Sequence, residues 1–331
     1  MTTAPASDAL PAEVRALAAR GAWRELDAWC AANAEAVEAR AELTNMHAEA
    51  LLRMGRAREA SERLAPAVPA AELRGDRPAL RRALTLLGAA DIALGELGGA
   101  EEAFSRASAL AREDGDHLVI ARAANNMGSI ANIRGRRDEA LALYRLAIPE
   151  YQRLGSAQGL AESHHNMAIS FRDSGQLEAA DDAERRAIDY AREAGSRWLE
   201  AAARLGRAEL SFRRGDAALA EAGARRVAAD FDSLGAPVPR ADALRLAGAA
   251  NVQLRRLDAA RSLLDEALAA TRAHGATLNE AETLRARAAL WAALGEIDAA
   301  RADARDAAAL FARLGADEER EEAEAWSSRQ S

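Results

Sequence analysis

Lysine is absent from this sequence of 331 residues, and cysteine, histidine and aromatic residues are scarce. The basic residues other than histidine are therefore all arginine. This bias fits a GC-rich genome, because arginine codons can be GC-rich and lysine codons cannot, although a functional reason stays open. The formal net charge of -8 argues against a general nucleic-acid-binding protein. A single cysteine, Cys30, excludes an internal disulfide and favours a cytoplasmic protein.

Long apolar runs are also missing, so we expect no segment that spans a membrane. The residues before position 13 contain two prolines and no basic cluster, which does not match a secretory signal. The abundant residues are alanine, leucine, glutamate and arginine, which are strong helix formers, and the composition predicts an all-α protein. The length suits either two ordinary domains or one long repeat array.

Internal repeats favour the array. Small residues recur at intervals of forty residues in several series that share one register. The clearest are Gly75, Gly115, Gly155, Gly195, Gly235, Gly275 and Gly315; Ala60, Ala100, Ala140, Ala180, Ala220, Ala260 and Ala300; Gly55, Gly95, Gly135, Gly175, Gly215 and Gly295, with Arg255 in place of the sixth glycine; and Ala48, Gly88, Gly128, Ala168, Ala208, Gly248 and Ala288.

Each series marks one structural position in the repeated unit. The Gly55 series separates two apolar stretches with helical spacing, which predicts the turn between two helices, and the Gly75 series predicts the end of the second helix. Asp116, Ser156 and Ser196 follow such an end and are good N-caps for the next helix. Each unit is therefore predicted to be an antiparallel helix pair that buries its apolar face by stacking on its neighbours.

These marks resemble the tetratricopeptide repeat, and the third unit matches best through Gly128, Gly135, Ala140, Tyr144 and Ala147. The family repeat has 34 residues. The repeat of 40 residues looks like the long variant found in cell-polarity adaptors, and in sensor domains of bacterial transcription regulators and peptide-pheromone receptors. The resemblance implies an all-α fold, a right-handed α-solenoid superhelix of antiparallel helix pairs.

The register predicts four segments along the chain. We expect a disordered N-terminal tail over 1–10, and a capping helix pair over 11–40 with Gly21 at its turn and Trp23 and Trp29 covering the end. Seven repeats are expected over 41–320, followed by a C-terminal capping helix and tail over 321–331.

A binding groove follows from the resemblance, because in this family the first helices of the pairs line the concave face. Positions 2, 5, 6, 9, 12 and 13 of each unit are implied to face it, and arginine and acidic residues occupy them in similar numbers. A protein or peptide partner is the implied ligand. The candidate binding residues are Arg82, Arg122, Asn125, Asn126, Ser129, Asn132, His165, Asn166, Arg172, Arg213 and Arg245.

The asparagines of the third and fourth units carry this binding hypothesis. An asparagine side chain both donates and accepts hydrogen bonds, so it can pair with the backbone of an extended peptide. Asn126 and Asn166 occupy equivalent positions, as a ladder of such contacts requires. The alternative is that the asparagines only keep the groove hydrated. An arginine clamp for a carboxylate and a polar pocket around His164 and Arg204 are two further hypotheses.

Catalytic, metal and cofactor sites are not indicated. Adjacent His164 and His165 point to different faces of a helix, which does not suit a zinc pair. Cys30 is expected to lie far from every histidine in a linear array, which disfavours a Cys–His nucleophile. We therefore expect a protein that is not an enzyme and that needs no cofactor.

Three functions stay open at this point. The first is a scaffold or regulatory adaptor that binds a protein or peptide in the groove. The second is a structural subunit that assembles through its ends or convex face, where Trp198, Trp291 and Trp326 would matter most. The third is a sensor for a small molecule or signalling peptide that acts with an effector in trans. The oligomeric state is not predicted.

Overall fold

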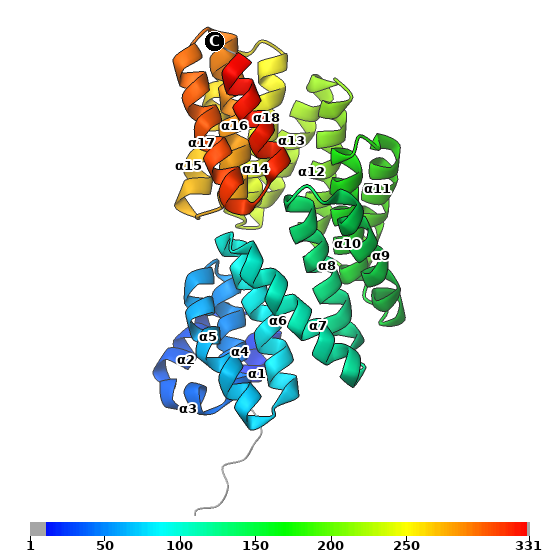
Figure 1. Ribbon diagram of the computed structural model, residues 1–331, viewed down its shortest axis with the longest axis vertical. Helices are drawn as coiled ribbons and strands as arrows, with labels where there is room; N and C mark the ends of the chain where they lie inside the picture. Colours follow the sequence, from blue (N-terminus) through cyan, green and yellow to red (C-terminus); the bar gives the residue numbers. More distant parts are fainter. Residues whose placement is uncertain (1–10, 330–331) are drawn as a thin grey trace, which may run out of the picture. The chain divides into compact units, whose positions relative to one another are not determined.

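A computed structural model describes residues 11–329, so the predicted tail over 1–10 and the last two residues lie outside the described range. The regular structure in this range is entirely helical, which confirms the all-α prediction (Figure 1). The helices are α1 (Ala12–Ala19), α2 (Trp23–Ala32), α3 (Ala34–Ala39), α4 (Ala41–Arg53), α5 (Ala57–Arg74), α6 (Arg77–Leu94), α7 (Leu97–Asp114), α8 (His117–Ile133), α9 (Arg137–Arg153), α10 (Ala157–Asp173), α11 (Leu177–Glu193), α12 (Arg197–Arg213), α13 (Ala217–Ser233), α14 (Pro237–Gln253), α15 (Leu257–Ala273), α16 (Thr277–Leu294), α17 (Ile297–Leu314) and α18 (Asp317–Arg329).

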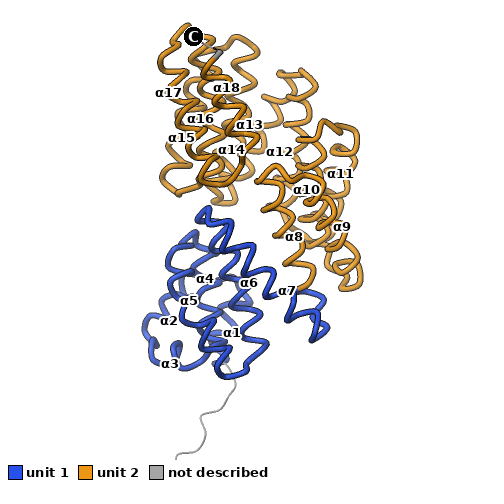
Figure 2. The backbone as a smooth tube through the Cα atoms, viewed as in Figure 1, with its two compact units in different colours: residues 1–119 blue, residues 120–331 orange. Residues whose placement is uncertain are grey.

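The chain forms two compact units, residues 1–119 and residues 120–331, and the boundary falls within α8 (Figure 2). In unit 1 the N-terminal segment differs from the single capping pair that we expected, because Asn33 interrupts the second helix and a third short helix, α3, follows. Leu26, Cys30 and Val37 form a core there with residues of α4. Unit 2 contains α8 from residue 120 onward, α9, the four helix pairs α10/α11 to α16/α17, and α18.

The turns follow the glycine series as predicted. Gly135 and Gly155, for example, take φ values of 73° and 61°, a region that disfavours residues with a Cβ atom. The predicted N-caps are also present, since the side chains of Ser156 and Ser196 accept hydrogen bonds from the amides of Gly159 and Leu199. The sequence therefore encodes the forty-residue spacing of the helix pairs through local backbone requirements.

Arg255 replaces the turn glycine between α14 and α15, and it is the residue other than glycine with a positive φ (59°) in the part of the chain described. A left-handed conformation costs a residue with a side chain about 1–2 kcal/mol, part of which glycine loses again through the entropy of the unfolded chain. We predict that Arg255→Gly stabilises unit 2 by about 0.5–1 kcal/mol and slows hydrogen exchange in α14 and α15. The reverse change, Gly215→Arg at the equivalent turn, should destabilise. A faster exchange in Arg255→Gly would contradict the prediction.

Packing between the two helices of a pair depends on a large residue that meets a small one. A Cβ atom added to Gly128 would lie 2.5 Å from the ring of Tyr144, and a Cβ atom added to Gly248 would lie 2.6 Å from Leu264. Tyr144 and Leu264 occupy the same position of their units, so this contact is repeated along the array.

Candidate functional site

Polar side chains of α8 and α10 meet within unit 2. The Oδ1 atom of Asn125 accepts hydrogen bonds from Ser163 Oγ at 3.0 Å and from Asn166 Nδ2 at 3.4 Å, and Asn166 Nδ2 also lies 3.3 Å from Ser129 Oγ. Asn125 is buried. These asparagines therefore join two successive first helices to each other, a structural role that neither sequence hypothesis included.

The other two asparagines differ from each other. Asn132 Oδ1 accepts a hydrogen bond of 2.7 Å from Ser170 Oγ, which again links α8 to α10. Asn126 is half-buried, and its side chain makes no hydrogen bond to any residue between 11 and 329. Asn126 is therefore the asparagine of this group whose hydrogen-bonding groups are left for a ligand or for water.

A buried acid interrupts the apolar pattern of the fourth unit. Glu184 on α11 occupies the position of Tyr144 and Leu264 in their units, and its side chain is 2% exposed. Both carboxylate oxygens lie within 3.1 Å of Nδ1 of His165 on α10. A Cβ atom added to Gly206 on α12 would lie 1.8 Å from this carboxylate. The glycine therefore provides the space in which the ion pair fits.

His165 belongs to the face that our candidate residues share. Burial opposes a charge on its ring, but the neighbouring Glu184 carboxylate outweighs this effect and raises the pKa of His165. The carboxylate also fixes the orientation of the ring through Nδ1, so Nε2 is the atom that can meet a ligand. Nε2 has no hydrogen-bond partner among residues 11–329.

Charged residues of α10, α12, α14 and α16 continue this surface. Arg245 on α14 pairs with Glu209 at 2.5 Å, with Asp242 at 2.8 Å and with Glu282 at 3.4 Å, and its side chain is 12% exposed. On α10 the guanidinium of Arg172 pairs with the adjacent Asp173 at 2.9 Å. We call this set the charged face. It consists of His165, Arg172, Asp173, Glu209, Arg213, Asp242, Arg245 and Glu282.

Ion pairs connect the charged face across four first helices, since Arg213 of α12 lies 3.7 Å from Asp173 of α10 and Arg245 of α14 pairs with residues of both α12 and α16. Burial opposes a charge on Glu282 of α16, but several arginines outweigh this effect and lower its pKa, among them Arg172 of α10. The charges of this face therefore act on one another beyond single ion pairs.

The two ends of unit 2 also meet. Arg137 at the start of α9 pairs with Glu318 and, at 3.2 Å, with Glu319 at the start of α18. A Cβ atom added to Gly315 would lie 3.8 Å from Nε of Arg134. These contacts join residues about 180 positions apart, so the repeats of unit 2 turn back on themselves around the charged face.

The remaining predicted residues lie in different surroundings. Arg82 lies in unit 1 and pairs with Glu49 at 2.5 Å. Arg122 is exposed on α8 of unit 2, and Arg213 lies 3.7 Å from Asp173 on the charged face. Ten of the candidates, all except Arg82, therefore belong to unit 2.

His164 and Arg204, for which a polar pocket was one hypothesis, have separate partners. His164 is buried and stacks on Tyr190 with ring centroids 5.6 Å apart. Burial, aided by Arg186, lowers the pKa of His164 to about 4. Arg204 instead pairs with Glu200 at 2.8 Å. His164 is therefore a neutral core residue, whereas the adjacent His165 pairs with Glu184 and belongs to the charged face.

Cys30 is closer to a histidine than we expected. His47 on α4 hydrogen-bonds to Asp27 at 2.7 Å, and Asp27 lies one helical turn before Cys30 on α2. The linear view of the array missed this proximity because α2 packs against α4. Burial raises the pKa of the Cys30 thiol to about 11, so a thiolate nucleophile is not available at neutral pH. Among residues 11–329 no cluster of three or more histidine, cysteine or acidic residues is suited to hold a metal ion.

The tryptophans expected to support assembly have different environments. Trp198 is 44% exposed and contacts Phe231 edge-on. Trp291 donates a hydrogen bond of 2.9 Å to Asp303 and lies beneath the guanidinium of Arg261. Trp326 lies on α18 and lines a cavity together with residues of α16 and α17. Within residues 11–329, no helix is both long and apolar enough to cross a membrane.

Comparison with known proteins agrees with this architecture. Residues 119–193 match the family model described as tetratricopeptide repeat. The chain is similar in structure to a Rap protein complexed with competence and sporulation factor, with 12% identity, a TM-score of 0.65, and 96% of this chain and 95% of that chain covered. It is also similar to aspartyl phosphate phosphatase F from Bacillus subtilis, with 14% identity, a TM-score of 0.55, and 100% and 95% coverage.

A third similar structure is the APC/C hetero-tetramer Cut9–Hcn1, with 15% identity, a TM-score of 0.61 and 94% of this chain covered. The chain spans 54% of the length of that relative. No curated protein sequence matches. At these identities, the solved structures share their fold with this chain.

Proposed function

We propose that this chain, which is a tetratricopeptide-repeat protein, is a non-catalytic regulatory scaffold that binds an extended peptide segment of a partner on the charged face of unit 2. The observation that carries the proposal is the charged face itself, in which ion pairs join α10 to α12, α12 to α14 and α14 to α16 on the side around which unit 2 curves. A concave surface can contact a peptide from several helices at once. The fold shared with a Rap protein complexed with competence and sporulation factor supports a binding function.

The chemistry of this surface suits a peptide rather than a single small anion. Arg245 is already neutralised by three carboxylates, and Arg172 by Asp173, so the face presents alternating charges instead of one basic centre. A peptide with both acidic and basic side chains can exchange with these internal ion pairs. Nε2 of His165 on this face, and Asn126 on the adjacent first helix α8, add further hydrogen-bonding groups.

The proposal is tested with peptides selected from a random display library against the full chain. Asn126→Ala should weaken the selected peptides about five- to tenfold, because one or two hydrogen bonds to the peptide backbone are lost. The fold should be unaffected, since the Asn126 side chain has no hydrogen-bond partner between residues 11 and 329. The measurement is isothermal titration calorimetry.

A matched control is Asn279→Ala, which removes a half-buried asparagine in the first turn of α16, outside the charged face. It should leave affinity unchanged. Asn166→Ala is less suitable, because this change also breaks hydrogen bonds between α8 and α10. Equal affinities for the wild type and Asn126→Ala would count against the proposal.

A further inference from the structure

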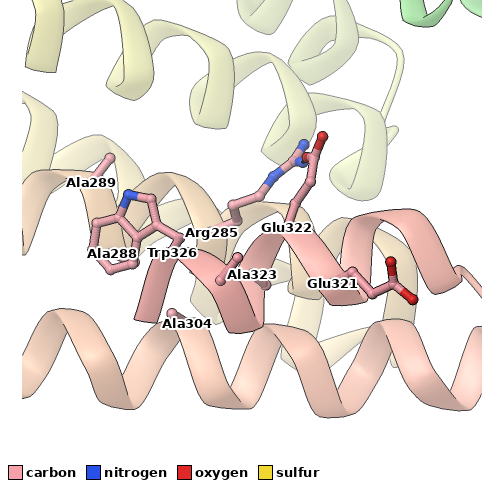
Figure 3. Close-up of a pocket in the computed structure, with 9 residues that line it drawn as sticks. Arg285, Ala288, Ala289, Ala304, Glu321, Glu322, Ala323 and Trp326 are labelled. Carbon is pink, nitrogen blue, oxygen red and sulfur yellow. The ribbon is translucent and has the colours of Figure 1, made fainter. Parts of the chain in front are cut away.

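A cavity of about 560 Å³ lies between α16, α17 and α18 of unit 2 (Figure 3). Ala288, Ala304 and Ala323 are buried in its lining, and the indole of Trp326 lies against one side. At its edge Arg285 and Glu322 point toward each other and pair at 3.4 Å. Its inner lining is therefore apolar and its edge is charged.

The seventh unit places small side chains on both sides of a contact that several other units fill with a large one. Ala304 occupies the position that Tyr144 and Leu264 hold in their units, where each of them packs against a glycine of the facing helix. In the seventh unit the facing residue is Ala288, so both members of the contact are small. Phe104, Tyr144 and Leu264 fill this volume in the second, third and sixth units, whereas the fifth unit also has a small pair, Ala224 with Ala208. In the seventh unit both small residues line the cavity.

The cavity adjoins the charged face. Arg285 is placed forty residues after Arg245 and thus holds the same position of the next unit. Its guanidinium lowers the pKa of Glu282, a member of the charged face, against the effect of burial. A peptide that runs along the charged face toward α16 therefore reaches the opening of this cavity.

We propose that the cavity receives an aromatic side chain of the peptide bound on the charged face, an inference that rests on the proposed function. Pockets of 300–1,000 Å³ lined mainly by apolar groups are typical of ligand sites. An aromatic ring buries 150–250 Å² and can stack on the indole of Trp326, while the alanines accept its flat body without hydrogen bonds. A peptide side chain is favoured over a free molecule because Arg285 and Glu322 at the edge can pair with peptide charges on either side of the ring.

Blocked amino acids test this specificity on the full chain by saturation-transfer NMR. N-acetyl-tryptophan amide should bind at least tenfold more tightly than N-acetyl-alanine amide. Ala304→Leu, which restores the residue type of Leu264, should reduce the affinity for the tryptophan amide at least tenfold while the protein stays folded. Ala309→Leu adds the same volume to the exposed side of α17 and should change nothing. Trp326→Ala is a second variant, expected to weaken binding severalfold without filling the cavity.

Three outcomes overturn the inference: equal binding of the two amides, unchanged binding in both Ala304→Leu and Trp326→Ala, or binding of free indole with exclusion of the tryptophan amide, which would assign the cavity to a small molecule. The proposed function fails separately. If Asn126→Ala weakens selected peptides but Ala304→Leu does not, the inference about the cavity is wrong and the charged face still binds peptide. If the tryptophan amide binds as expected but selected peptides bind the wild type and Asn126→Ala with equal affinity, the proposed function is wrong.

Discussion

His165→Ala should destabilise unit 2 by about 3 kcal/mol at neutral pH. The change removes the partner of the Glu184 carboxylate, which is 2% exposed and faces Gly206. Removal of one member of a buried ion pair typically costs 3–5 kcal/mol, because the other charge loses both water and its partner. We take the lower end because water can enter beside His165, whose side chain is 19% exposed. Urea unfolding monitored by circular dichroism measures the loss.

The double variant His165→Leu with Glu184→Leu provides the control. Leucine occurs naturally at both positions in other units, since Leu205 is the counterpart of His165 and Leu264 is the counterpart of Glu184. Replacement of a whole buried pair by apolar residues is often neutral or stabilising. We therefore expect the double variant to be at least as stable as the wild type. A double variant that loses as much stability as His165→Ala would show that the pair itself is not the reason for the loss.

Acidification should destabilise unit 2 through His164 by about 3 kcal/mol between pH 7 and pH 4. An unfolded histidine has a pKa near 6.5, whereas burial and Arg186 lower the pKa of folded His164 to about 4. Between these values the unfolded chain binds a proton that the folded chain does not. The stability contribution is therefore complete above pH 6.5 and is lost as the pH falls toward 4, at about 1.4 kcal/mol per pKa unit.

The neighbouring His165 should respond in the opposite direction. Its folded pKa is raised, so its contribution is complete below pH 6.5 and is lost as the pH rises through the folded value. NMR titration of the two Cε1 protons measures both pKa values. His164→Phe retains a ring to stack on Tyr190 and should remove the acid-dependent loss assigned to His164. An ordinary pKa for His164 in the folded protein would refute this assignment.

Much of the fold could be predicted from the sequence because its determinants are local. A positive φ at Gly135 and a capping hydroxyl at Ser156 are requirements of single positions, and they recur with the repeat. The division into two units and the contact of Arg137 with Glu318 could not be predicted. They depend on curvature that accumulates over many repeats, and no single residue reports it.

The candidate site was predicted less completely. The positions implied by the family resemblance include His165, Arg172 and Arg245, which the structure places on one face. The hydrogen bonds between Asn125 and Asn166 were missed, because a pattern of polar residues does not distinguish a contact between helices from a contact with a ligand. A signal for Glu184 was present, however: an acid stands in the series that contains Tyr144 and Leu264.

The residues beside the cavity can be compared with those at equivalent positions of the other units. Ala224 and Ala304 are further breaks in that series, and alanine alone does not reveal whether a neighbouring side chain fills the space. Trp326, on the last helix, lines this space without filling it. Departures from the repeat therefore mark the positions at which the packing of one unit differs from that of the others.

The most direct test of the central claim is a map of where a selected peptide contacts the protein. A peptide carrying p-benzoylphenylalanine at successive positions is irradiated with the full chain, and the cross-linked residues are identified by mass spectrometry. We predict cross-links to α8 near Asn126 and to α10, α12, α14 and α16 around the charged face, with the aromatic position of the peptide nearest to α18. Cross-links confined to unit 1, or to the second helices α11, α13 and α15, would contradict the account.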